Sequence, residues 1–293
     1  MAVASPNRDD ITLGQAYAIL AEERYWSGFF PEGIELSQQA IALLEPAEMP
    51  SRLGMAHFVL GLNALQSGAF AQALQAAEQA LTLGLAIGDP HLPTFAEWLT
   101  GWTQATCGKW EAGLEACQRS LKHVSDPLSA AMALGWLGYV YLEHHEPVEA
   151  IPLLEQAIQR MKVLKRRRLE GLYTTFLSEA YLAHNERERA YDLACQGLLI
   201  AQQATYRVGV AWAQRSLGHI SQVTDSLVAA EPYLRGALAS FEAIQARFEI
   251  ARTHLSVAKL AHAQSKREVA LRHLTEADHR FRMLQVPTYI TRT

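Results

Sequence analysis

The sequence predicts an all-α protein of about seven helical hairpins, or about fourteen helices, wound into an α-α superhelix. Two observations predict this fold. Of the 293 residues, 49% are apolar and 19% are charged, a composition that supplies a buried core and differs from that of a disordered chain. A repeat of about 40 residues also runs through nearly the whole chain, which is the signature of a solenoid of stacked units.

The repeat is anchored at short polar or glycine positions, where each hairpin is expected to turn. Gly28, Gly68 and Gly108 follow one another at intervals of 40 residues, and the later intervals are 37 and then 40 residues. Glycine, asparagine, aspartate, serine and histidine are residues that end helices or form turns. The predicted turns after Gly108 lie at His145, Asn185, Asp225 and Ser265.

Three columns of small residues accompany the anchors in all seven copies. One column lies seven residues before the anchor, and the other two lie five and twelve residues after it. Because a small side chain lets two helix axes approach closely, each column predicts a contact between helices. Four glycines of the first column are therefore expected to pack against a neighbouring helix: Gly61, Gly101, Gly138 and Gly218.

The columns also give the order of the elements. In each copy the first helix precedes the anchor, and in most copies a large apolar residue stands beside its small one, such as Leu20 beside Ala21. The second helix follows the anchor and shows apolar residues at helical spacing, such as Ile34 and Ile41. The predicted organisation is a tail over 1–10, a superhelix over 11–286 with hairpins near 14–46, 54–89, 94–126, 131–165, 171–205, 211–245 and 251–286, and a tail over 287–293.

This arrangement resembles the tetratricopeptide repeat family. That family has small residues at repeat positions 8, 20 and 27, glycine at position 15 and an aromatic residue at position 17, which corresponds here to Phe30, Phe70 and Trp110. The period of about 40 residues is longer than the usual 34 and is similar to that of the repeats that follow the ATPase domains of large bacterial transcription activators and nucleotide cyclases. The resemblance implies a right-handed superhelix whose first helices line a concave groove.

Composition excludes several classes of partner. The chain has 26 Lys and Arg against 30 Asp and Glu, and this net charge of −4 argues against a nucleic-acid binder. No apolar stretch is long enough to cross a bilayer, no signal peptide is recognisable, and the three cysteines lack the spacing of a disulfide framework or a zinc site. We therefore expect a cytoplasmic protein with no membrane partner.

Charge is unevenly distributed along the chain. Residues 1–160 carry a net charge of −11, whereas residues 161–293 carry +7. Opposite fields along a superhelix with uncapped terminal repeats favour weak head-to-tail self-association. A dense basic run between the fourth and fifth repeats has two interpretations, a solvated helix end or an electrostatic patch for an acidic partner. This patch comprises Lys162, Lys165, Arg166, Arg167 and Arg168.

No motif for catalysis, a metal or a cofactor stands out. The stretch that ends in Gly108-Lys109-Trp110 lacks the glycine spacing and the following hydroxyl residue of a phosphate-binding loop. His144 and His145 do not belong to a helical metal-binding pair. We therefore expect a protein that is not an enzyme and that holds neither a metal nor a cofactor.

The resemblance also implies which residues line the groove. The groove-facing positions of the family give an apolar, aromatic wall in repeats two to four and a polar, positively biased wall in repeats six and seven. Trp98 and Trp102 lie one helical turn apart and are expected to form a joint anchor for a partner. The alternative is that the longer helices bury some of these side chains between neighbouring repeats. The predicted groove residues are Met55, Phe58, Leu62, Phe95, Trp98, Trp102, Tyr139, Arg215, His219, Arg252, Lys259 and His262.

These observations predict a non-catalytic interaction scaffold or regulatory module that binds a partner peptide or protein in its groove, in bacterial signalling or regulation. The alternative function is a small-ligand sensor domain of a multidomain transcription activator or cyclase. A closed pocket around Trp98 and Trp102 would favour that alternative.

Overall fold

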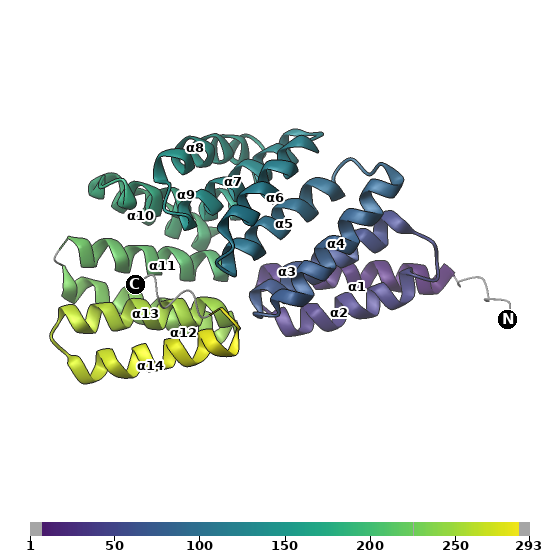
Figure 1. The fold of residues 1–293 in the computed structure, drawn as a ribbon. Helices are drawn as coiled ribbons and strands as arrows, with labels where there is room; N and C mark the ends of the chain where they lie inside the picture. Colours follow the sequence, from purple (N-terminus) through teal and green to yellow (C-terminus); the bar gives the residue numbers. More distant parts are fainter. Residues whose placement is uncertain (1–7, 225, 287–293) are drawn as a thin grey trace.

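The computed structural model describes residues 8–224 and 226–286, and over these residues the chain forms fourteen α-helices and no strand. The helices pack as consecutive antiparallel pairs that wind into a tetratricopeptide-repeat-like solenoid (Figure 1). The all-α prediction is thereby confirmed. The helices are α1 (Arg8–Ser27), α2 (Phe30–Leu44), α3 (Pro50–Gln66), α4 (Phe70–Ile87), α5 (Leu92–Thr106), α6 (Trp110–Lys122), α7 (Pro127–Glu143), α8 (Pro147–Val163), α9 (Arg167–Ala183), α10 (Arg187–Gln203), α11 (Arg207–Val223), α12 (Leu227–Ala243), α13 (Arg247–Ala263) and α14 (Arg267–Met283).

Helix α1 begins at Arg8, inside the segment 1–10 that the sequence predicts to be a tail. The predicted tail at 287–293 and the predicted turn at Asp225 lie outside the described residues. Five helices carry a proline in their first turn, where a missing N–H costs no helical hydrogen bond.

The hairpins turn at the predicted anchors, which adopt the left-handed backbone conformation. These anchors, with their φ angles, are Gly28 (79°), Gly68 (79°), Gly108 (78°), His145 (62°), Asn185 (65°) and Ser265 (59°). The amide after each anchor then donates back to a carbonyl of the first helix, as Phe29 N does to Arg24 O at 2.8 Å. This turn satisfies carbonyls that the helix end would otherwise leave unpaired.

The small-residue columns are helix contacts, as predicted. Of the 21 column residues, 20 are buried, and the exception is Ala270 in the last hairpin. A Cβ placed on Gly138 in α7 would lie 2.8 Å from Leu154 Cγ and 3.3 Å from Ala150 O, both in α8. The glycine therefore lets the two helices of this hairpin touch.

The first hairpins of the solenoid also contact the last ones, so the superhelix closes on itself (Figure 1). Trp26 at the end of α1 and Tyr206 at the start of α11 have ring centroids 5.6 Å apart. Phe70 of α4 and Phe248 of α13 are 5.9 Å apart. We call this zone of contact the seam. At the seam the first two hairpins lie against the last three.

Candidate functional site

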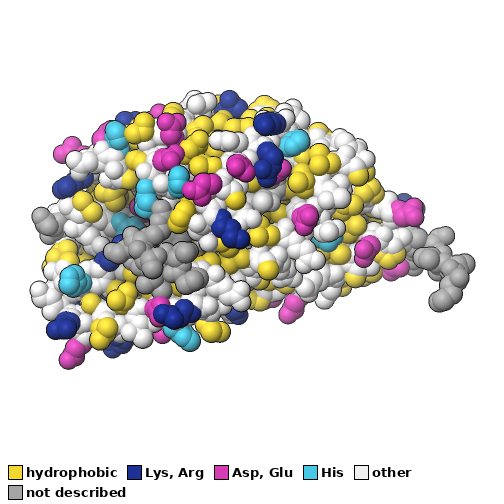
Figure 2. All heavy atoms as spheres, viewed as in Figure 1, with side chains coloured by type: hydrophobic (Ala, Val, Ile, Leu, Met, Phe, Trp, Pro, Cys, Tyr) yellow, Lys and Arg dark blue, Asp and Glu magenta, His cyan; other side chains and the backbone are white. Residues whose placement is uncertain are grey.

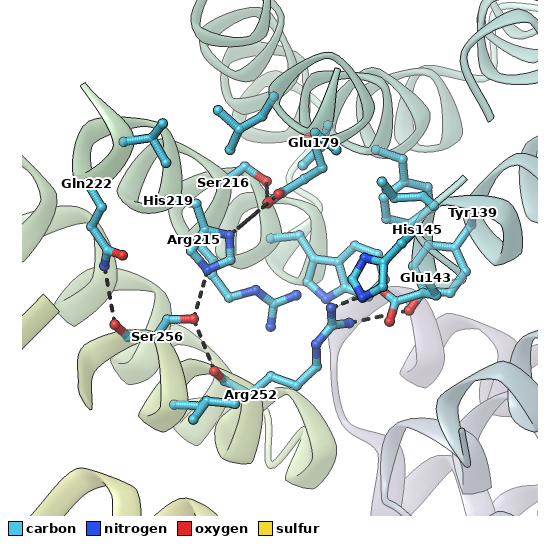
Figure 3. A pocket seen from close by; sticks show the side chains of 18 of the residues that line it. Tyr139, Glu143, His145, Glu179, Arg215, Ser216, His219, Gln222, Arg252 and Ser256 are labelled. Atoms are coloured by element: carbon cyan, nitrogen blue, oxygen red, sulfur yellow. Dashed lines mark hydrogen bonds and ion pairs between the residues drawn. The ribbon is translucent and has the colours of Figure 1, made fainter. Parts of the chain in front are cut away.

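The concave side of the superhelix holds a pocket of about 480 Å³ between α7, α9, α11 and α13 (Figure 3). Each of these helices is the first helix of its hairpin. The pocket therefore lies in the groove that the repeat pattern predicts. Its charged and aromatic lining gives it two distinct sides.

Three aromatic side chains form the apolar side. Phe176 of α9 lies between Tyr139 of α7 and Trp212 of α11, with ring centroids 4.7 and 4.6 Å away. Tyr139 and Trp212 also stack on each other at 5.7 Å. The indole Nε1 of Trp212 is buried and has no hydrogen-bond partner among the described residues. All three rings are buried, with exposed fractions of 2% to 3%, and they form the apolar base of the pocket.

The polar side contains a chain of hydrogen bonds across three helices (Figure 3). His219 Nδ1 lies 3.1 Å from Glu179 Oε1, and His219 Nε2 lies 2.8 Å from Ser256 Oγ. Ser216 Oγ donates to the same Glu179 oxygen at 2.6 Å. Burial disfavours the Glu179 carboxylate, but His219, Ser216 and Arg215 outweigh it and lower the pKa of Glu179 to about 2. Glu179 is therefore an anion at neutral pH.

Two arginines connect the pocket to neighbouring helices. Arg215 forms a buried ion pair with Glu249 of α13. Arg252 Nη2 donates to Glu143 Oε1 at 2.8 Å, and Nη1 donates to the Tyr139 hydroxyl at 3.4 Å. Glu143 and Tyr139 lie on α7, so Arg252 bridges the groove from the seventh hairpin to the fourth.

Five of the predicted groove residues line this pocket: Tyr139, Arg215, His219, Arg252 and Lys259. His262 is exposed on α13 and does not belong to the lining. Met55 and Phe95 are half-buried and line a separate hollow of about 330 Å³ between the starts of α3, α5 and α7. The structure thus divides the predicted groove residues among several places.

The aromatic wall of repeats two to four requires a correction, because four of its residues are core. Phe58, Leu62, Trp98 and Trp102 are buried, and the two tryptophans are only 2% and 3% exposed. Trp136 of α7 fills the space beside them and stacks on Trp102 at 3.9 Å and on Trp98 at 5.2 Å. The first helices of repeats three and four pack directly together, which is the burial that the sequence left open as an alternative. No partner can contact these side chains in this conformation.

Two arginines of the predicted basic patch make contacts with other residues of the chain, and the other three residues are exposed. Lys162, Lys165 and Arg166 are exposed. Arg167 pairs with Glu170 at 2.9 Å, and the Arg168 guanidinium lies 5.5 Å from the Trp26 ring centroid. Arg168 therefore packs against a residue of the seam.

The sequence prediction missed several pocket residues. The groove register that identifies Arg215 and Lys259, carried to the fifth repeat, gives Leu172, Thr175, Glu179 and Leu182, and the last three of these line the pocket. Glu143 and Ser256 lie one position away from that register, and no sequence signal marks them.

Other kinds of site are not indicated in the described part of the chain. Residues 8–224 and 226–286 contain no cluster of three or more histidine, cysteine or carboxylate side chains that could hold a metal. None of the helices over the same residues combines the length and apolarity that crossing a bilayer requires.

This chain is similar to known proteins in its fold, whereas its sequence shows little similarity to theirs. No family model and no curated protein matches the sequence. A Rap protein complexed with competence and sporulation factor aligns with a TM-score of 0.70 at 14% identity, covering 95% of this chain and 79% of that one. NprR in complex with its cognate peptide NprX aligns with a TM-score of 0.64 at 10% identity, covering 97% and 84%.

A third similar structure is a signal transduction ATPase with a tetratricopeptide repeat sensor from Pyrococcus horikoshii. It aligns with a TM-score of 0.57 at 15% identity over 88% of this chain, which spans 41% of that protein. The chain has a tetratricopeptide-repeat-like fold.

Figure 2 shows that its surface mixes apolar and charged side chains over the hairpins on the face drawn.

Proposed function

We propose that the chain is a non-catalytic regulatory module that binds a segment of a peptide or protein in its groove. The observation that carries this proposal is the pocket between α7, α9, α11 and α13, where aromatic rings face hydrogen-bonding side chains. Its volume of about 480 Å³ falls within the range of roughly 300–1,000 Å³ that is common for ligand pockets.

The chemistry of the lining supports a peptide as the ligand. A peptide segment presents apolar side chains together with backbone donors and acceptors, and the pocket offers both kinds of partner. Leu142, Leu182 and Val223 line the pocket with accessible apolar side chains that suit an apolar residue of a ligand, whereas Gln222 suits the backbone. The complex of NprR with its peptide NprX, which shares this fold, is consistent with the proposal.

The test is selection from a pool of randomised short peptides on the immobilised protein, with mass spectrometry of the retained sequences. We expect the wild type to retain a defined subset and the His219→Ala variant to lose it. Val228→Ala, which changes a side chain that is 86% exposed on α12, should retain the same subset as the wild type. A wild type that retains no peptide would contradict the proposal.

A second candidate function is a small-ligand sensor domain of a larger ATPase-linked protein. The similarity to the sensor-bearing ATPase, of which this chain spans 41%, and the period of about 40 residues favour it. Thermal unfolding with a panel of small metabolites separates the two candidates. A metabolite that raises the midpoint in the wild type but not in His219→Ala would support the sensor.

We also propose that the chain is not an enzyme, although Glu179, His219 and Ser256 have the order of an acid–histidine–hydroxyl chain, which catalyses hydrolysis in other proteins. Ser256 Oγ donates to Arg252 O at 3.1 Å within α13, and a helix interior leaves no backbone N–H free to stabilise an oxyanion. We expect p-nitrophenyl acetate hydrolysis to be the same for the wild type and for Ser256→Ala. Faster hydrolysis by the wild type would identify an enzyme.

A further inference from the structure

A pair of histidines connects the two helices of the last hairpin. His254 of α13 and His273 of α14 have their Nδ1 atoms 2.9 Å apart and their ring centroids 5.1 Å apart. At this distance one neutral imidazole donates its Nδ1–H to the bare Nδ1 of the other. His254 is only 7% exposed, and its Nε2 is buried with no hydrogen-bond partner among the described residues. The hydrogen bond between α13 and α14 therefore requires that at least one of the two rings is neutral.

The histidine pair distinguishes the last hairpin from the other six. His254 lies eleven residues before the anchor Ser265, and His273 lies eight residues after it. The fourth hairpin has leucine at both of these positions, Leu134 and Leu153. The second position is aliphatic or aromatic in all six of the other hairpins, where it holds Leu36, Ala76, Ala116, Leu153, Leu193 and Tyr233. The last hairpin thus has a titratable contact where the others have an apolar side chain.

Several groups oppose protonation of the pair. A second proton would give both Nδ1 atoms a hydrogen and place two positive rings in contact, so the hydrogen bond would be lost. Arg280 adds positive charge near His254, and Arg272 adds it near His273. Glu276 acts on both rings, but its carboxylate accepts a hydrogen bond from Arg280 Nε at 2.7 Å. All of these charges lie on α14, and among the described residues α11 and α12 contribute none of the charges that act on the pair.

Helix α14 also supports the seam. The Phe248 ring of α13 lies between Phe281 of α14 and Phe70 of α4, with each centroid 5.9 Å away. Leu284, which follows α14, packs against Gly68 at the turn of the second hairpin. Separation of α14 from α13 would therefore remove contacts that hold the second hairpin against the seventh.

We propose that the His254–His273 pair is a pH-sensitive latch, which holds α14 on α13 at neutral pH and releases α14, together with its contacts at the seam, in mild acid. In the released state both imidazoles reach water, and each can take up a proton without an opposing charge beside it. Helix α13 also carries Arg252 and Ser256 of the pocket, so the latch and the pocket share one helix.

The direction of the pH effect follows from the two protonation equilibria. Burial, His273 and Arg280 lower the pKa of His254 from 6.5 to about 4, and burial and Arg272 lower the pKa of His273. The released state therefore binds protons more tightly than the closed state. The stability that the pair contributes is fully present above about pH 6.5, the pKa of an exposed histidine, and is lost as the pH falls toward the folded pKa.

Hydrogen exchange with mass spectrometry of the full chain at about pH 7.5 and about pH 5 tests the latch. After correction for intrinsic exchange rates, we expect the protection of the wild-type α14 amides to fall by on the order of tenfold at the lower pH. The double variant His254→Leu with His273→Leu copies the leucine pair of the fourth hairpin and should show no such fall. His279→Gln, which changes an exposed histidine of α14, is the matched control and should behave as the wild type does.

Equal protection of the wild-type α14 amides at both pH values would overturn the proposal, and so would a fall that persists in the double-leucine variant. Nuclear magnetic resonance of the wild type gives a second measurement, which does not depend on how the double variant folds. The Cε1–H resonances of His254 and His273 should titrate below the ordinary histidine range near pH 6.5. Titration of both rings within that range would likewise exclude the latch.

Discussion

Trp26 and Tyr206 lie 180 residues apart in the chain and pack edge to face, with ring centroids 5.6 Å apart. Arg207 adds a hydrogen bond from Nη1 to Ser27 O at 3.4 Å. An open solenoid has contacts between neighbouring repeats only. Here the first hairpin is tied to the join between the fifth and sixth, so the position of the groove walls depends on both ends of the chain.

Loss of these contacts should open the superhelix. For the double variant Trp26→Ala with Arg207→Ala, we expect a larger radius of gyration in small-angle X-ray scattering, with helical circular dichroism unchanged. The free energy of unfolding should fall by roughly 1–3 kcal/mol, because an aromatic pair and part of a buried side chain are lost. Val228→Ala serves as the control, and an unchanged radius in the double variant would show that the seam does not hold the superhelix closed.

The two buried tryptophans should behave as core residues. Trp98→Ala removes a ring that packs against Trp136 and Phe58, so we expect the free energy of unfolding to fall by roughly 3–5 kcal/mol. Urea denaturation followed by circular dichroism measures this change. Phe95→Ala, at a half-buried position of the same helix, should cost less. A Trp98→Ala variant of wild-type stability would return this residue to the candidates for partner contact.

Contact at the small-residue column can be tested at Gly138. Alanine there forces Leu154 or the backbone of α8 to move, and we expect a loss of roughly 1–3 kcal/mol in the free energy of unfolding. Gly236→Ala in α12 is the matched change. Its nearest neighbour is the mobile end of Gln214, at 3.1 Å, so the better helix propensity of alanine should leave stability equal or up to about 1 kcal/mol higher. Equal losses at both positions would contradict the role of the column.

The Glu179 carboxylate should make stability depend on acid pH. Its pKa is lowered from 4.5 to about 2 in the folded chain, so the folded state favours the charged form. Its contribution is therefore present above the unfolded pKa and is lost as the pH falls through the folded pKa. We expect Glu179→Gln to lower the free energy of unfolding by on the order of 2 kcal/mol at pH 7, with the difference from wild type shrinking between about pH 5 and pH 2. A difference that is constant with pH would rule out this ionisation effect.

Head-to-tail self-association remains a prediction. Helices α1 and α14 at the two ends expose Leu13 and Leu20, and Leu271 and Leu274, respectively. Because exposed charges are screened beyond about 8–10 Å near physiological salt, association driven by the uneven charge should weaken as salt rises. Sedimentation velocity at low and high salt measures this. A monomer in both conditions, or an oligomer that salt strengthens, excludes charge-driven assembly.

The repeat pattern predicts every described hairpin turn, because the conformation of each turn is determined by residues close to it in the sequence. A residue such as Asn185 adopts a left-handed φ of 65° in response to the helix end beside it, and the small columns report contacts between adjacent helices. The seam has no such signature. Whether Phe70 reaches Phe248 depends on rotation accumulated over five hairpins, and no spacing in the sequence records that sum.

The groove register describes one face of each first helix, and Arg215, His219 and Arg252 of that register line the pocket. Whether they bind a partner stays a prediction. The register does not distinguish a side chain that faces the open groove from one that meets the next repeat. Trp102 follows the register and is nevertheless covered by Trp136, since the longer helices bring repeats three and four into direct contact.

Closure also limits how this chain can evolve. Open repeat arrays gain or lose units by duplication and deletion, because each unit needs only its neighbours. Across the seam, Gly28 faces Ile244 so closely that a Cβ would lie 2.7 Å from its Cγ2, and Gly68 faces Leu284. Insertion or deletion of one hairpin would put a different residue opposite each glycine. The contacts across the seam therefore constrain the number of hairpins that lie between them along the chain.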